Sequence, residues 1–287
     1  MEPTLRPARP GDKEAILAFT RETWSWGDYL ERVYDAWLAD PAAHPVAAEV
    51  GGEVVGFARG SLPSAAESWA QGLRVHPGHR GRGLGTALMR DLMAWSGAAG
   101  ARVMRLSVWE EHVLGFFATL GFHSVGEWLA GWYPSAPGGP NPRGNGAKRV
   151  PARQRLTPVP AAEADAAMLA WAGGPLERAA HGLFPVDWAW RRLNLGDLEA
   201  AAGRRALWQA PSGWALAEVD EDAFAVTWLC TYPEEAPALL RALHGAAAAA
   251  GVERLELQVP ALGWLGAALE QDGWHLQPLR VLARPLP

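Results

Sequence analysis

The residues of this chain that are best suited to chemistry lie in one short segment rich in glycine and arginine, residues 73–88. A strand-like run ends at Val75, Pro77 interrupts it, and leucines at helical spacing begin at Leu84. The first backbone amides of a helix have no partner within the helix and lie at the positive end of its dipole. A loop that opens a helix in this way predicts a binding site for an anion such as a phosphate or pyrophosphate.

The side chains of this loop favour the same chemistry. Its glycines have no Cβ, so an anion can come close to the backbone amides. Its two arginines add positive charge beside that approach. The residues expected to hold the anion are Arg80, Gly81, Arg82, Gly83, Leu84, Gly85 and Thr86.

Three kinds of phosphate loop can be compared with this segment. A Walker loop requires Gly-Lys-Ser/Thr, and the only lysines, Lys13 and Lys148, lie elsewhere. A dinucleotide fingerprint requires a third glycine where Thr86 stands, and an acid about twenty residues further on, where Arg102 and Arg105 lie. The third pattern, Arg/Gln-x-x-Gly-x-Gly/Ala, is satisfied by the residues from Arg80 to Gly85.

That third pattern resembles the acetyl-CoA loop of the GNAT superfamily of N-acetyltransferases. The resemblance covers residues 4–134 and includes a hairpin, a splayed strand, the loop, a helix, a strand and a downstream Gly121-Phe122. It implies that acetyl-CoA is the acyl donor and that the main chain of Leu73 and Val75 pairs with its pantetheine arm. It also implies that the amides of the loop hold the pyrophosphate. The reaction implied is direct attack of a neutral amine, on a small molecule or a peptide, on the thioester.

The resemblance also identifies one departure from the pattern. Family members often have a tyrosine before the Gly-Phe pair that protonates the departing thiolate, whereas this chain has Phe117, which has no proton to donate. For the base, Glu67 at the start of the strand that leads into the loop is the preferred candidate, and His44 and Glu49 are weaker ones.

The acceptor site is expected on the first two helices and the last strand hairpin of this half. Carboxylates and aromatic rings on these helices suit a cationic amine through charge and cation–π contacts, although an ordinary amphipathic helix pair would carry the same residues. These side chains are Glu22, Asp28, Glu31, Asp35, Trp24, Trp26, Tyr29 and Tyr34.

The order of predicted elements divides the chain into two similar halves. A Pro/Gly-rich basic linker over residues 135–154 separates a domain at 1–134 from one at 155–287. Both halves predict an α/β domain with a mixed sheet, and a helix at Val186–Asn194 is among the elements expected in the second. We therefore interpret the chain as two tandem GNAT-like domains. Glu234 and Glu235 stand where the second loop should lie and would repel an anion, which indicates a degenerate copy without cofactor binding.

Composition bounds the remaining possibilities. The 287 residues carry a net charge of −5, which argues against general nucleic-acid affinity, and no apolar run is long enough to cross a membrane. The single cysteine, Cys230, excludes an intramolecular disulfide and a cysteine-based zinc site, and no metal is expected. The sequence thus predicts a cytoplasmic N-acetyltransferase, either a monomer whose halves imitate a dimer or a homodimer. The alternative function is a CoA-binding sensor or scaffold that turns over weakly.

Overall fold

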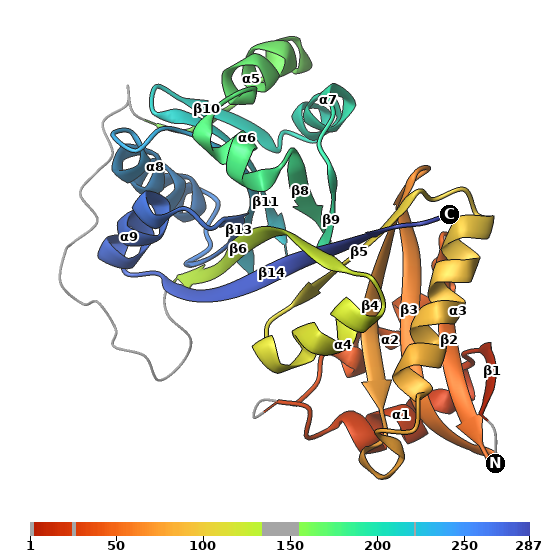
Figure 1. Cartoon of the computed structure of the whole chain (residues 1–287). Coiled ribbons are helices and arrows are strands. Elements are labelled where there is room, and N and C mark those ends of the chain that lie inside the picture. Colours follow the sequence, from red (N-terminus) through yellow and green to blue (C-terminus); the bar gives the residue numbers. More distant parts are fainter. Residues whose placement is uncertain (1–2, 25–26, 134–154, 221) are drawn as a thin grey trace. The chain divides into compact units, whose positions relative to one another are not determined.

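The computed structural model describes residues 3–24, 27–133, 155–220 and 222–287, and these form two compact units with mixed α/β structure (Figure 1). Unit 1 comprises Met1–Ser107, His112–His123 and Leu282–Pro287, and unit 2 comprises Val108–Glu111 and Ser124–Val281. The predicted linker at 135–154 lies outside the described residues.

The sheet of unit 1 is antiparallel from β1 to β4 and then gains a parallel neighbour, β5. The end of β14, from Leu282, also belongs to this unit. The strands run over β1 (Thr4–Pro7), β2 (Ala43–Val50), β3 (Glu53–Ser64), β4 (Glu67–Val75), β5 (Val103–Val108) and β14 (His275–Pro285).

Helices cover both faces of this sheet. Successive residues of a strand point to opposite faces, and on β3 both faces carry residues that pack against a helix. Phe57 packs against Tyr34 and Trp37 of α2, whereas the Cα of Gly60 faces Leu92 and Trp95 of α3. The described part of unit 1 has four α-helices. They are α1 (Lys13–Thr20), α2 (Leu30–Ala39), α3 (Leu84–Ala98) and α4 (Leu114–Thr119).

A buried carboxylate anchors the start of α1. Asp12 accepts two hydrogen bonds from the Arg6 guanidinium, at 2.7 and 2.9 Å, and one from the backbone N–H of Arg9 at 2.8 Å. The hydrogen bonds from Arg6 outweigh the effect of burial and lower the pKa of Asp12 below its ordinary value.

This lowered pKa predicts how the stability of unit 1 depends on pH. Asp12 contributes its full stabilisation above the ordinary aspartate pKa of about 3.9 and loses it as the pH falls through the lower pKa of the folded state. We expect Asp12→Asn to be less stable than wild type at pH 6, with a difference that shrinks below about pH 4. Urea unfolding between pH 6 and pH 2 measures this, and two parallel stability curves would contradict it.

The sheet of unit 2 repeats the pairing pattern of unit 1. β7, β10, β11 and β12 are antiparallel in that order, and β12 is parallel to β13. The strands are β7 (Thr157–Pro158), β10 (Leu207–Ala210), β11 (Gly213–Asp220), β12 (Ala223–Cys230) and β13 (Arg254–Pro260), and the helices are α5 (Ala164–Trp171), α6 (Pro175–Ala180), α7 (Leu195–Gly203), α8 (Ala236–Ala249) and α9 (Gly263–Asp272).

The last strand of the first half does not stay with that half. β6 (His123–Tyr133) pairs antiparallel with β13, from Trp128↔Pro260 to Tyr133↔Leu255, and belongs almost entirely to unit 2. The compact units therefore do not correspond to the two halves of the sequence on either side of the linker. Unit 1 includes the last residues of β14, from Leu282, and unit 2 includes β6 from Ser124.

The helix predicted at Val186–Asn194 is wrong. This region forms a two-stranded hairpin of β8 (Leu183–Val186) and β9 (Ala189–Arg192), and Asp187 and Trp188 make its two-residue turn with positive φ angles of 48° and 63°. Such a turn normally carries Asn-Gly or Asp-Gly, so the glycine that would reveal a hairpin in the sequence is missing here.

Candidate active site

The sheet of unit 1 opens between its two parallel strands. β4 pairs with β5 only from Glu67↔Val103 to Trp69↔Arg105, and β4 then continues to Val75 without further pairing to β5. One edge of the second half of β4 is therefore available for main-chain hydrogen bonds to an extended ligand. Leu73 and Val75, the residues predicted to make such contacts, lie in this open part.

A bulge in β4 accompanies the opening. Phe57 pairs with Arg74 and Arg59 with Gln71, so β4 holds one more residue than β3 between these pairs. Gly72 lies in the bulge at φ +67°, and a Cβ there would come within 2.7 Å of the Trp37 ring. Only glycine fits this position, because both the backbone conformation and the space exclude a side chain.

The predicted anion loop follows β4 directly. A single 3-10 turn at Pro77–His79 leads to Gly81 at φ +73° and to Gly83 at φ +81°, which is the residue before α3. A Cβ placed on Gly81 or Gly83 would meet no protein atom within 4 Å. The space in front of both glycines is therefore open.

The amides at the start of α3 have no partner from a capping side chain. The first backbone hydrogen bond at this end runs from Ala87 to Gly83, so the N–H groups of Leu84, Gly85 and Thr86 have no intrahelical acceptor. The first turn of α3 contains no acidic residue. Arg80 and Arg82 are exposed beside it, so the helix dipole and the side chains together favour an anion at this point.

Arg74 connects the open strand to the segment before α2, a contact that the sequence did not predict. Its guanidinium donates to Asp28 at 2.7 Å and lies over the rings of Trp24 and Tyr29, at 4.7 and 5.4 Å from their centroids. Asp28 is almost fully buried in this ion pair. Burial raises the pKa of the Tyr29 phenol, so it stays protonated.

Two of the four carboxylates expected to form a cationic-amine site are engaged in ion pairs. Asp28 pairs with Arg74, and Asp35 pairs with Lys13 at 2.5 Å. Tyr34 is buried and donates its hydroxyl to the backbone oxygen of Arg9, while Glu22 and Glu31 are exposed. Trp26 lies outside the described residues.

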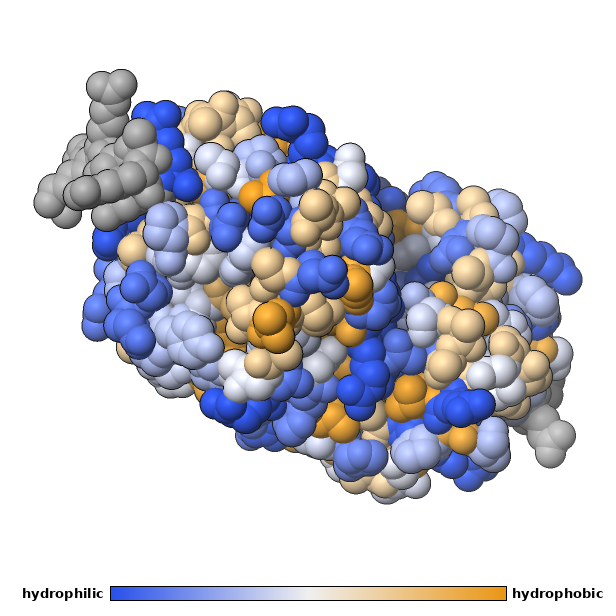
Figure 2. Space-filling model, turned by 90° about the horizontal axis from the view of Figure 1, so that it is seen from above, coloured by the Kyte–Doolittle hydropathy of each residue, from blue (hydrophilic) through white to orange (hydrophobic). Residues whose placement is uncertain are grey.

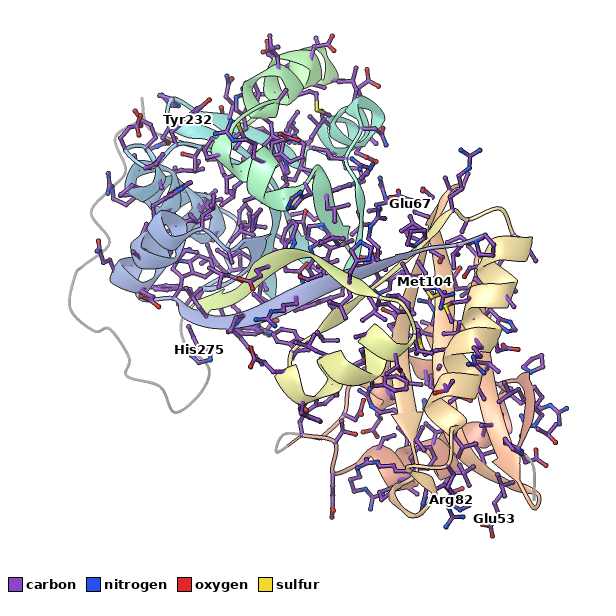
Figure 3. All side chains as sticks on the ribbon, in the orientation of Figure 1. Glu53, Glu67, Arg82, Met104, Tyr232 and His275 are labelled. Atoms are coloured by element: carbon purple, nitrogen blue, oxygen red, sulfur yellow. The ribbon has the colours of Figure 1, made fainter. Side chains whose placement is uncertain are left out.

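Glu67 lies at the closed end of the opening, at the far end of β4 from the loop that carries Arg82 (Figure 3). Its carboxylate accepts from Arg105 of β5 at 2.5 Å and from the Ser64 hydroxyl at 2.9 Å, and its side chain is mostly buried. It is the only carboxylate on β4 or β5. Its role as a base stays a prediction, and the ion pair also gives it a structural role in joining the two strands.

The weaker candidates for the base lie in other ion pairs. His44 on β2 contacts Asp91 of α3 at 2.8 Å and stacks on Trp95, on the α3 face of the sheet. Glu49 accepts from Arg6 at 2.8 Å.

Phe117 occupies a closed aromatic environment on α4. It is 8% exposed, and its ring makes edge contacts with Phe116 and Phe122 at centroid distances of 5.0 and 5.9 Å. Phe116 in turn lies 3.3 Å from the position of a Cβ on Gly85, so this glycine lets α4 approach the first turn of α3.

The second half has the opening in its sheet but not the free amides. β12 pairs with β13 only over Ala223–Val226, and β12 also has a bulge opposite Leu216 and Ala217. At the start of α8, however, the N–H groups of Glu235 and Ala236 both donate to Tyr232, and Pro237 has none. No free amide is left there for a phosphate, which agrees with the repulsion expected from Glu234 and Glu235.

The described residues outside the loop and the open strand show no cluster of chemically reactive side chains of the kind that binds a metal. An open hollow of about 640 Å³ in unit 1 is bounded by Arg90, Thr119 and Arg284 among others, and none of the loop residues lines it. Among the described residues no three His, Cys, Asp or Glu side chains gather as metal ligands, and every described helix is too short or too polar to span a bilayer. On the face shown in Figure 2, apolar side chains are scattered among hydrophilic ones.

Comparisons with known proteins agree with this geometry. Residues 13–122 match the model of the Acetyltransferase (GNAT) family. A GCN5-related N-acetyltransferase from Sphaerobacter thermophilus superposes with a TM-score of 0.67 at 17% identity, covering 99% of this chain and 96% of that one. Another, from Kribbella flavida, gives 0.53 at 17% identity, over 99% and 72%. A search of curated proteins found no significant match. At these identities the structural likeness shows a shared fold.

Proposed function

Since residues 13–122 match the model of the Acetyltransferase (GNAT) family, we propose that the protein transfers an acetyl group from acetyl-CoA to a primary amine of a small molecule or peptide. The observation that carries the proposal is the combination of three free amides at the start of α3 with an open edge on β4 directly before them. A cytoplasmic location is part of the same proposal.

The residues of the loop fit the donor's phosphates. The amides of Leu84, Gly85 and Thr86 would bind pyrophosphate oxygens, with Arg80 and Arg82 supplying charge. The edge of β4 at Leu73 and Val75, which β5 leaves unpaired, would hold the pantetheine arm and so direct the thioester towards the closed end of the opening. The carbonyl oxygens of these two residues accept from the side chains of Arg74 at 3.1 Å and Arg80 at 3.2 Å, so the arm would share or displace these bonds.

The transfer step needs a neutral amine, a stabilised oxyanion and a leaving thiolate. Backbone amides of β4 near the closed end would stabilise the oxyanion, and Glu67 would take the proton of the attacking amine. No acyl-cysteine intermediate is expected, because Cys230 is buried and its burial raises the pKa of its thiol to about 12. The amine therefore attacks the thioester directly, and the CoA thiolate, whose pKa resembles that of a free thiol at about 8.5, leaves without an acid.

We propose that the second half of the chain is a degenerate copy of the first that does not bind CoA. Its satisfied helix start supports one CoA site per chain rather than two. Titration calorimetry with CoA should therefore give a stoichiometry near one. Two equivalent sites would contradict the degenerate copy.

The decisive experiment is an acceptor screen that measures free thiol from acetyl-CoA with and without each amine. Release of thiol only in the presence of an amine supports the enzyme. A CoA-binding sensor is the second candidate, favoured by the absence of an acid at Phe117, and it predicts tight CoA binding with no amine-dependent release.

The aromatic packing of Phe117 predicts the effect of restoring a tyrosine. We expect Phe117→Tyr to lower the free energy of unfolding by about 1–3 kcal/mol, because its hydroxyl would be buried without an assigned partner. The rate should stay unchanged. Melting temperature and turnover are measured together. A stable variant with a faster rate, most of all below the thiol pKa, would instead place this ring beside the thioester sulfur.

A further inference from the structure

The hollow of about 640 Å³ in unit 1 has no part in the proposed transfer. Its lining residues come from the middle of α3, the end of α4 and the end of β14, and the last residue of the sequence lies beside the C-terminal end of α3 (Figure 1). All of them belong to unit 1. The hollow and the expected pyrophosphate site at residues 80–86 have no residue in common.

Arg284 of β14 is a half-buried arginine in this lining that has no carboxylate partner. It donates to the backbone oxygen of Leu120, and its guanidinium lies against Gly121. A carbonyl oxygen accepts a hydrogen bond but supplies no full counter-charge to a cation. In the described part of the chain, every other buried or half-buried arginine pairs with Asp or Glu, namely Arg6, Arg59, Arg74, Arg105, Arg191 and Arg280.

Arg90 of α3 is the second arginine of the lining, and it has no acid near it on its helix. The positions one turn away on either side are Thr86, Ala87, Met93 and Ala94, so the usual ion pair along a helix cannot form. Over the described ranges, no hydrogen bond or ion pair engages its exposed side chain. Its guanidinium donors are therefore available to a ligand.

The surroundings of the hollow supply no negative side chain to these two arginines. None of its lining residues is Asp or Glu, and the one acid of α3, Asp91, pairs with His44 of β2. Pro287 also lines the hollow and forms no ion pair with either arginine within the described structure. In a chain with a net charge of −5, this is a cationic hollow. Apolar residues make up much of the rest of its lining: Met93, Leu120, Pro285 and Leu286.

We propose that this hollow binds an organic anion that carries a carboxylate group. Arg90 and Arg284 hold the carboxylate, because guanidinium N–H groups match it in both geometry and charge. The apolar lining residues contact the hydrocarbon part of the ligand, and the volume is in the usual range for a small-molecule site. Binding here requires neither CoA nor transfer, so the proposal goes beyond the proposed function.

The test uses benzoate as the probe and benzamide as its neutral counterpart of nearly the same shape. Saturation-transfer NMR on the full chain should show benzoate binding about tenfold more tightly than benzamide, because only benzoate makes charge-assisted hydrogen bonds to arginine. The titration is repeated with an excess of CoA, which occupies the anion loop and should leave the benzoate affinity unchanged. Equal binding of the two probes, or displacement of benzoate by CoA, would overturn the proposal.

Variants assign the binding to the hollow. Arg90→Gln should weaken benzoate binding about tenfold at an unchanged melting temperature, because Arg90 is exposed and has no hydrogen bond to lose. Arg284→Gln should weaken it as much and also lower the melting temperature, since the bond to Leu120 is lost. Arg32→Gln is the matched control, because Arg32 of α2 is an exposed arginine of the same unit that does not line the hollow. Wild-type affinity in Arg90→Gln, or an equal loss in Arg32→Gln, would overturn the assignment.

Discussion

Titration of CoA into a Gly83→Ala variant is expected to show an affinity about 10²–10⁴-fold below that of wild type. The added Cβ would occupy the open space through which a phosphate reaches the amides of Leu84, Gly85 and Thr86. Loss of about two hydrogen bonds to a charged group, at roughly 1.5–3 kcal/mol each, gives this range. The measurement is calorimetry with CoA, with the melting temperature recorded in parallel.

The chain offers a matched control for the backbone strain. Gly52 in the β2–β3 turn has φ +87°, and a Cβ there also meets no atom within 4 Å. Gly52→Ala should therefore lose about as much stability as Gly83→Ala and keep full CoA affinity. If both variants bind CoA like wild type, the loop does not hold the phosphates. If both lose affinity equally, strain alone explains the effect.

Replacing Glu67 with glutamine is expected to slow amine acetylation by about 10²–10⁴-fold, the usual contribution of a general base. Glutamine has nearly the same shape as glutamate and can still accept from Ser64, but it cannot take a proton from the amine. CoA affinity should not change, since Glu67 lies at the opposite end of β4 from the loop. The rate is measured at saturating acetyl-CoA with the best acceptor from the screen.

The ion pair with Arg105 requires a separate control, because Glu67→Gln leaves a buried guanidinium without its counter-charge. Breaking such a pair costs about 3–5 kcal/mol. Asp40→Asn breaks a comparable pair in unit 1, in which Asp40 accepts from the buried Arg59 of β3. It should lower stability without slowing turnover. A Glu67→Gln variant that is destabilised but as fast as wild type would leave this carboxylate only its role in joining β4 and β5.

The sequence by itself determined the features that depend on local backbone rules. Glycines at 81 and 83, leucines at helical spacing from Leu84, and a proline after Val75 specify a strand, a glycine-rich loop and a helix, and the structure has all three. The alternation of strands and helices likewise predicted a mixed α/β fold. The residues that form such a pattern lie close together in the sequence, so the pattern can be recognised without knowing which distant residues are in contact.

The start of α7 carries a local signal in the sequence. Asn194 and Asp197 form a capping box at the start of α7, and this spacing is readable in the sequence. The β8–β9 hairpin has no comparable signal, because Trp188 occupies the glycine position of its turn.

The tertiary structure alone decided which charged groups meet. Arg74 and Asp28 are 46 positions apart and Glu67 and Arg105 are 38 apart, and no periodicity links either pair. The choice of partner for β6 is equally non-local, since its pairing with β13 depends on which strand edge is free once both halves have folded. Residue spacing specifies where a backbone turns, whereas the neighbours of a buried charge depend on how the whole chain packs, because each such charge must find a partner within its own folded unit.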